Sequence, residues 1–126
     1  MREMTYKEEV ATLLDDIDVA SQKVSRLAIA EMKRLMEKHG DHNTYPDGEE
    51  YYMITLEEER LEYTFDGMYI EVNEIVYRPE YDEVEISFDE YDRVHNYHGS
   101  SEANFAEFDC RNQAELVGVI RREYGE

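Results

Sequence analysis

Residues 61–72 read Leu-Glu-Tyr-Thr-Phe-Asp-Gly-Met-Tyr-Ile-Glu-Val, and this stretch decides the fold. Apolar and polar residues alternate on both sides of Asp66-Gly67, which is the period of a half-buried strand. Asp-Gly between two alternating runs is typical of a two-residue hairpin turn. The stretch therefore predicts two antiparallel strands joined by a tight turn.

Further strand patterns lie on both sides of this hairpin. Apolar residues alternate over residues 52–56 and again over residues 84–88, with a turn expected at 45–48 and another at 78–80. Residues 75–77 continue the second strand of the hairpin. A weaker last strand is expected over 91–97, followed by a loop at 99–101. The pattern predicts an antiparallel meander of four or five strands.

A long helix is expected before the strands, over residues 5–39. Its apolar residues recur at spacings of three and four, which places them on one stripe. They are Val10, Leu13, Leu14, Ile17, Val24, Leu27, Ala28, Met32, Leu35 and Met36. Thr5 and Glu8 resemble a capping box at its start. A helix of this length spans roughly 50 Å, whereas a strand spans about 20 Å. It must therefore kink near residues 15–18, overhang the sheet, or pack against a second subunit.

A second helix is expected over residues 112–124, after a short helical turn within 102–108. Asn112 as N-cap with Glu115 three residues later suggests its start, and Leu116, Val117, Ile120 and Tyr124 form its apolar face. The chain is thus expected to form one α+β domain over residues 1–126. A long N-terminal helix precedes the β-meander, a C-terminal helix follows it, and both helices pack on one face of the sheet.

The charge is large and unevenly placed. The net charge is −19, from 32 acidic and 13 basic residues. Residues 41–109 hold 21 acids against three arginines, a net charge of −18, and the rest of the chain contributes −1. Binding to DNA or RNA needs positive charge to displace counterions from phosphate. The composition therefore argues against direct nucleic-acid or anionic-membrane binding and favours a basic protein surface as the partner.

The strand alternation predicts where the carboxylates gather. If the apolar residues face the helices, the opposite face carries acids about 6.7 Å apart along a strand and about 4.8 Å apart between strands. The expected partner-binding residues are Glu62, Tyr69, Glu71, Glu83, Glu85 and Asp89. Tyrosine, with 11 copies in the chain, is enriched at protein interfaces because it offers contact area with a polar tip.

In size, charge and topology the chain resembles small acidic proteins of phages and mobile elements that mimic nucleic acid. Proteins of that kind block restriction, CRISPR or DNA-repair enzymes. The resemblance implies an inhibitor that occupies the basic groove of a DNA- or RNA-handling protein. Two other interpretations stay open. The charge could serve solubility or adaptation to high salt. The chain could instead be an adaptor, such as an acidic immunity protein, a secretion-type chaperone or a homodimer joined by the long helix.

Catalytic and metal chemistry have weaker support. The pairs His39/His42 and His95/His98 share a spacing found among zinc ligands, but a helix end and polar loops explain them equally well. Cys110 has no histidine near it in sequence and is interpreted as a packing residue. No phosphate-binding loop, dinucleotide fingerprint or nucleophile elbow occurs. We expect no enzyme activity, no cofactor and no metal. A lone cysteine and the absence of an apolar leader or span favour a cytoplasmic location.

Overall fold

The computed structural model describes the backbone of residues 6–65 and 68–126, and the side chains of residues 20–57 and 68–126. The elements in chain order are helix α1 (Tyr6–His39), strands β1 (Asp41–Thr44), β2 (Glu50–Phe65), β3 (Met68–Arg78), β4 (Glu83–Tyr91) and β5 (Tyr97–Asn104), and helix α2 (Cys110–Glu123). Short 3-10 turns η1 (Pro79–Tyr81) and η2 (Phe105–Glu107) precede β4 and α2.

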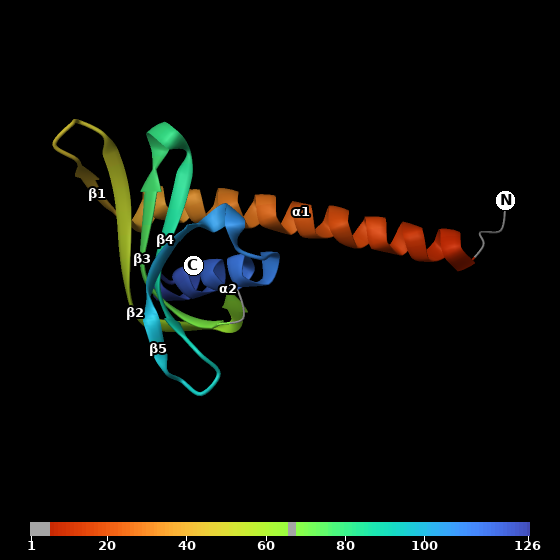
Figure 1. The fold of residues 1–126 in the computed structure, drawn as a ribbon. Helices are drawn as coiled ribbons and strands as arrows, with labels where there is room; N and C mark the ends of the chain where they lie inside the picture. Colours follow the sequence, from red (N-terminus) through yellow and green to blue (C-terminus); the bar gives the residue numbers. More distant parts are fainter. Residues whose placement is uncertain (1–5, 66–67) are drawn as a thin grey trace.

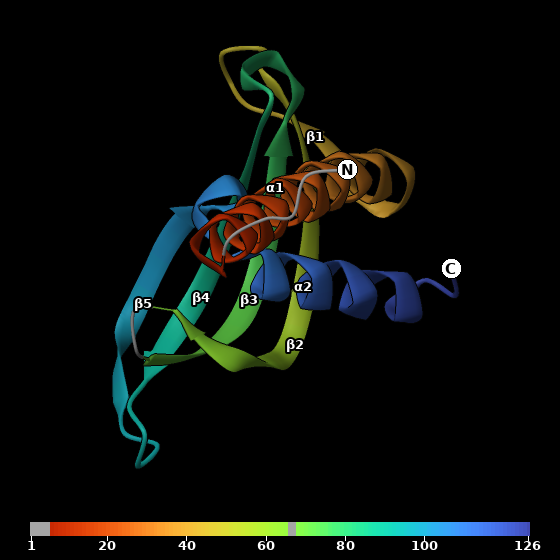
Figure 2. The same ribbon diagram turned by 90° about the vertical axis from the view of Figure 1, so that its right-hand side faces the viewer.

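The five strands form one antiparallel sheet in the order β1-β2-β3-β4-β5, so each strand pairs with its neighbour in sequence. Both helices lie on the same side of this sheet, and the opposite side is uncovered (Figures 1 and 2). The predicted α+β fold is thereby confirmed. Strands β2 and β3 flank the expected hairpin turn, but Asp66 and Gly67 themselves lie outside the described residues.

The core lies between the sheet and the two helices. Alternate residues of β3 and β4 are buried, as expected for a sheet with one covered face. Met32, Leu35 and Met36 of α1 and Leu116 and Ile120 of α2 are fully buried against them. The core clusters around these side chains, with Ile70, Ile75, Ile86, Phe88 and Phe105 contributed by the strands and η2.

Helix α1 neither kinks nor ends early, because it is continuous from Tyr6 to His39 and overhangs the sheet (Figure 1). It ends where Gly40 N donates to Met36 O at 2.9 Å. The predicted cap at Thr5 lies outside the described residues. Val24 and Leu27, which belong to the predicted apolar stripe of this helix, are 41% and 71% exposed. No helix in the described parts of the chain combines the length and the apolar character of a membrane span.

The predictions for the last two strands were wrong in detail. Strand β4 ends at Tyr91, and the chain turns before β5 begins at Tyr97, so residues 91–97 are not one strand. In this turn the Asp92 side chain accepts from the amides of Val94 and Asn96, at 3.0 and 2.9 Å. The residues at 99–101, expected in a loop, pair with β4 instead. Strand β1 had no sequence signal and forms by pairing with β2.

Helix α2 begins earlier than predicted. Asp109, not Asn112, is its N-cap, and Asp109 Oδ1 accepts from Asn112 N at 2.8 Å. Asn112 lies inside the first turn and is fully buried. The expected apolar face is confirmed for Leu116, Val117 and Ile120, because all three are buried, but not for Tyr124, which is 38% exposed.

A β-bulge shifts the alternation in the middle of β3. Val72 pairs with Phe88 and Glu74 pairs with Ser87, so Asn73 is an extra residue on its strand. Val72 and Ile75 are both buried even though three positions separate them. The bulge therefore keeps both halves of β3 in the core.

Candidate binding surface on the open face of the sheet

The uncovered side of the sheet, here called the outer face, carries the predicted acids. Glu83, Glu85 and Asp89 alternate with the buried Val84, Ile86 and Phe88 and are therefore directed away from the helices. Tyr69 and Glu71 have the same relation to Ile70 and Val72 on β3. The structure thus places five of the six predicted residues on this face. The sixth, Glu62, lies in β2, and its side chain is outside the described part of the chain.

Cross-strand pairing brings like charges together. Glu71 of β3 is the register partner of Asp89 of β4, and Asp89 in turn is the partner of Ser100 of β5. Ser100 Oγ donates to Asp89 Oδ1 at 2.6 Å. Directly opposed like charges destabilise a sheet, and this hydroxyl offsets part of that cost by hydrogen-bonding one of the two carboxylates.

A second pair of acids lies across β4 and β5. Desolvation raises the pKa of Glu85, and a hydrogen bond with the carboxyl group of Glu102 raises it further. Glu83 is nearby and accepts a hydrogen bond from Asn104 Nδ2 at 3.1 Å. The carboxyl groups of Glu102 and Glu83 therefore lie close enough to disfavour the ionisation of Glu85.

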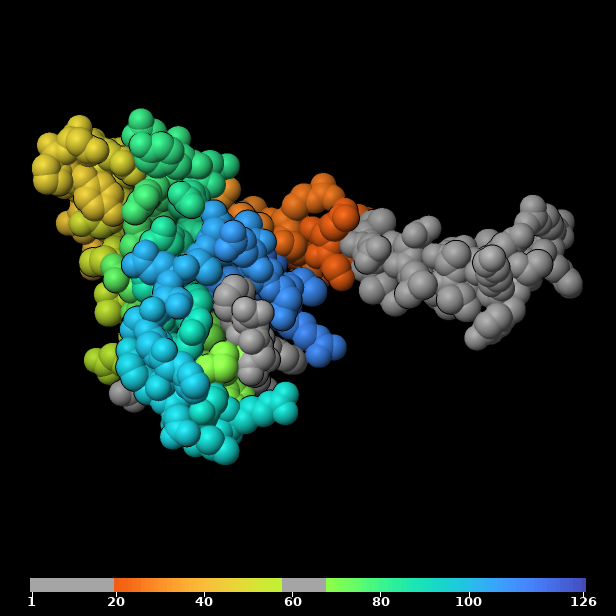
Figure 3. Space-filling model, in the orientation of Figure 1, coloured from red at the N-terminus to blue at the C-terminus, as the bar shows by residue number. Residues whose placement is uncertain are grey.

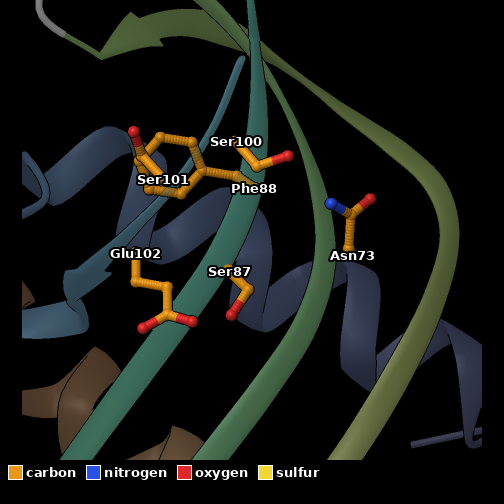
Figure 4. Close-up of a pocket in the computed structure, with 6 residues that line it drawn as sticks. All are labelled: Asn73, Ser87, Phe88, Ser100, Ser101 and Glu102. Atoms are coloured by element: carbon orange, nitrogen blue, oxygen red, sulfur yellow. The ribbon is translucent and has the colours of Figure 1, made fainter.

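A shallow hollow of about 350 Å³ lies beside these acids, where the bulge of β3 faces β4 and β5. Figure 4 shows the Glu102 carboxylate and the Ser87 hydroxyl extending in the same direction from neighbouring strands. Its other lining residues are Asn73, Phe88, Ser100 and Ser101. Short hydroxyls and an amide beside carboxylates make this hollow suited to accept hydrogen bonds from a cationic side chain.

Tyrosines flank the acids at both ends of the outer face. Tyr91 is the register partner of Tyr69 and of Tyr97, and the rings of Tyr91 and Tyr97 are 5.7 Å apart. Desolvation raises the pKa of the Tyr91 hydroxyl, and the carboxylates of Glu71 and Asp89 raise it further.

At the other end Tyr45 and Tyr51 stack at 4.2 Å, with the Arg78 guanidinium 5.8 Å from the Tyr45 ring. The outer face therefore combines carboxylates with aromatic rings, which together suit arginine-rich surfaces.

Sequence reasoning missed Glu74 and Glu102. Strict alternation placed Asn73 on the outer face, but the bulge brings Glu74 opposite Ser87 there as well. Glu102 was missed because residues 99–101 read as a loop, whereas it pairs with Ser87 in β5. A signal for the bulge was present, since the apolar positions change from even to odd between Val72 and Ile75.

Each histidine has a separate contact. His39 stacks on Tyr124 at 4.4 Å and contacts the Glu126 carboxylate, whereas His42 stacks on Tyr52 at 4.8 Å. His95 stacks on Tyr91 at 5.2 Å, and His98 Nε2 lies 2.9 Å from Asp92 Oδ2. Among the described residues, no three His, Cys, Asp or Glu side chains are grouped so that they could hold a metal ion.

Comparisons with known proteins give no assignment. No protein-family model matches the chain, and neither the curated proteins nor the solved structures contain a match. Functional inference therefore rests on the geometry and charge of the outer face.

Proposed function

We propose that this protein binds and inhibits a nucleic-acid-handling protein by presenting the outer face to its basic groove. The observation that carries the proposal is the concentration of carboxylates on one uncovered sheet face. They are Glu71, Glu74, Glu83, Glu85, Asp89 and Glu102. A groove that binds phosphates responds to the density and spacing of negative charge. Carboxylates on neighbouring strands provide both the density and the regular spacing of negative charge. Inhibition by this route requires no catalysis by the acidic protein.

The energetics of the face support a binding role over a role in solubility. Solubility requires acids anywhere on the surface. Here Glu71 faces Asp89 directly across the strands, and burial together with the neighbouring Glu102 disfavours the charged state of Glu85. A cationic partner would reduce the repulsion between these carboxylates when it binds. The repulsion in the free protein therefore favours formation of the complex.

The test is capture of a partner by tagged protein from a lysate of its host, at about 50 mM salt and then about 500 mM salt. Contacts between many charges weaken steeply with salt, so the partner should elute in the second wash. Mass spectrometry would then identify it. Excess duplex DNA or RNA at constant ionic strength should release the same partner, because the nucleic acid and the protein that mimics it compete for one groove.

Charge reversal supplies the matched control. The triple variant Glu71→Lys, Glu83→Lys and Glu85→Lys should lose the captured protein. Glu80→Lys, Glu107→Lys and Glu123→Lys make the same change of net charge at exposed sites in η1, η2 and α2, and should keep it. Equal capture by both triple variants would show that total charge, rather than the outer face, attracts the partner.

A further inference from the structure

Helix α1 carries an apolar surface that the fold does not cover. Val24 is 41% exposed and Leu27 is 71% exposed. Together with Ala28 and with Ala114 and Val117 of α2, they line a groove of about 350 Å³ between the two helices, to which Glu31 and Arg121 also contribute. In Figure 3 the start of the described side chains of α1 (orange) extends beyond the sheet and α2. Exposed apolar surface of this kind marks an interaction site more often than a solvated one.

The sequence of α1 continues this surface as a heptad repeat. Positions 10, 17 and 24 are Val, Ile and Val, and positions 13, 20 and 27 are Leu, Ala and Leu. These are the a and d positions of three consecutive heptads, and residues so spaced share one face of a helix. Val24 and Leu27 are the last members of this series, which leads directly into the groove.

We propose that α1 pairs with α1 of a second copy of this chain as an antiparallel coiled coil. In one common register position 10 stands opposite position 27 of the other copy, position 13 opposite position 24, and position 17 opposite position 20. Every a position then meets a d position, and the overhanging half of each helix lies on the groove of the other copy.

The charges of α1 fit this antiparallel arrangement. Residues 6–19 hold one base and five acids, a net charge of −4, whereas residues 20–39 hold five bases and two acids, a net charge of +3. In this register residues 6–17, with a net charge of −3, face residues 20–31 of the other copy, with a net charge of +1. Asp16 and Lys23 both occupy g positions, so in the proposed dimer two symmetry-related Asp16–Lys23 pairs face each other along one flank of the interface.

The charge of the rest of the molecule selects the same orientation. Residues 41–109 carry −18 and follow α1 directly in the chain. A parallel pair would bring two such bodies together at one end, whereas an antiparallel pair keeps them at opposite ends of the helices. This inference is independent of the proposed function, because the outer face lies on the far side of the sheet from α1 (Figure 1).

Light scattering after size exclusion tests the proposal at about 100 μM protein, a concentration that reveals even moderate affinities. The wild-type chain should have the mass of a dimer. Leu27→Asp should be a monomer with unchanged helix content, since Leu27 is outside the core. Gln22→Asp, exposed on the opposite side of the same helix, should remain a dimer. A monomeric wild type, or a dimeric Leu27→Asp variant, would overturn the proposal.

A charge exchange fixes the orientation and does not depend on the folding of Leu27→Asp. Asp16→Lys alone and Lys23→Asp alone should each weaken the dimer roughly tenfold, because two attractive pairs become repulsive. The two single variants mixed together, or both changes in one chain, should restore wild-type affinity. Failure of both restorations would exclude the antiparallel register.

Discussion

The carboxyl groups of Glu85 on β4 and Glu102 on β5 lie within hydrogen-bonding reach of each other. Such a bond needs a proton on one of the two groups, so it forms best when the pair is not fully ionised. The outer face therefore holds a strained electrostatic arrangement at neutral pH, and its strain can be measured through stability.

Glu85→Gln should stabilise the free protein at pH 7 by up to about 1 kcal/mol, because the amide keeps a hydrogen bond to Glu102 without the second charge. The pKa of Glu85 is raised in the folded state, so its carboxyl group favours folding at low pH, and that contribution is lost as pH rises through the folded pKa. The gain from Gln should shrink on going from pH 7 to pH 4. Urea unfolding at both pH values measures it, with Glu107→Gln, exposed in η2, as the control.

Two leucines on α1 offer a matched test of the core boundary. Leu35→Ala removes a fully buried side chain and should cost about 3 kcal/mol of unfolding free energy. Leu27→Ala makes the same chemical change at a position that is 71% exposed and should cost about 0.5 kcal/mol or less within a single copy. Denaturant unfolding at low protein concentration compares them, and similar losses would contradict the described position of α1.

The N-cap of α2 should be sensitive to the loss of one oxygen atom. Asp109→Ala removes the acceptor of the Asn112 amide and should cost about 1 kcal/mol, whereas Asp109→Asn keeps a side-chain oxygen and should cost much less. Thermal unfolding of both variants checks this. Equal destabilisation by Ala and Asn would show that the negative charge at the helix end, rather than the hydrogen bond, matters.

The turn between β4 and β5 makes a pH-dependent prediction. The pKa of Asp92 is lowered to about 2, first by the hydrogen bond to His98 and then by the backbone amide of Asn96. The contribution of this carboxylate to folding is present above its unfolded pKa and is lost as pH falls through about 2. His98→Ala should raise the pKa of Asp92, so that the loss occurs at higher pH. NMR titration of the Asp92 carboxyl carbon measures the shift, and His42→Ala should leave it unchanged.

Elements whose residues alternate or repeat strongly could be predicted from the sequence. The elements α1, β2, β3, β4 and α2 belong to this class, and in β4 and α2 the burial of the side chains follows the sequence period. Strand β5 does not. Its residues Gly99, Ser100 and Ser101 have little intrinsic preference for strands, and it forms because β4 offers an edge with which to pair. The local sequence of β5 does not show that β4 will be available as a neighbouring strand, because that depends on the tertiary structure.

The residues of the candidate site could likewise be predicted only where the strands alternate regularly. Alternation was sufficient to place Glu71, Glu83, Glu85 and Asp89 on one face, since each adjoins a buried apolar residue. It failed at Glu74, where the bulge changes the phase of β3. It placed Val24 and Leu27 on the same apolar stripe as the buried Met32 and Leu35, although both are exposed, because periodicity identifies such a stripe but does not show what covers it.

Because both helices pack on one side of the sheet, the core and the outer face place separate demands on the sequence. Substitution at Ile86 or Phe88 disturbs packing, whereas substitution at the intervening Ser87 changes only the surface. A lineage of such proteins could alter its charge pattern step by step while the scaffold stays constant. In an evolutionary contest with a changing target, this division would let the exposed strand positions diverge quickly while the buried ones are retained.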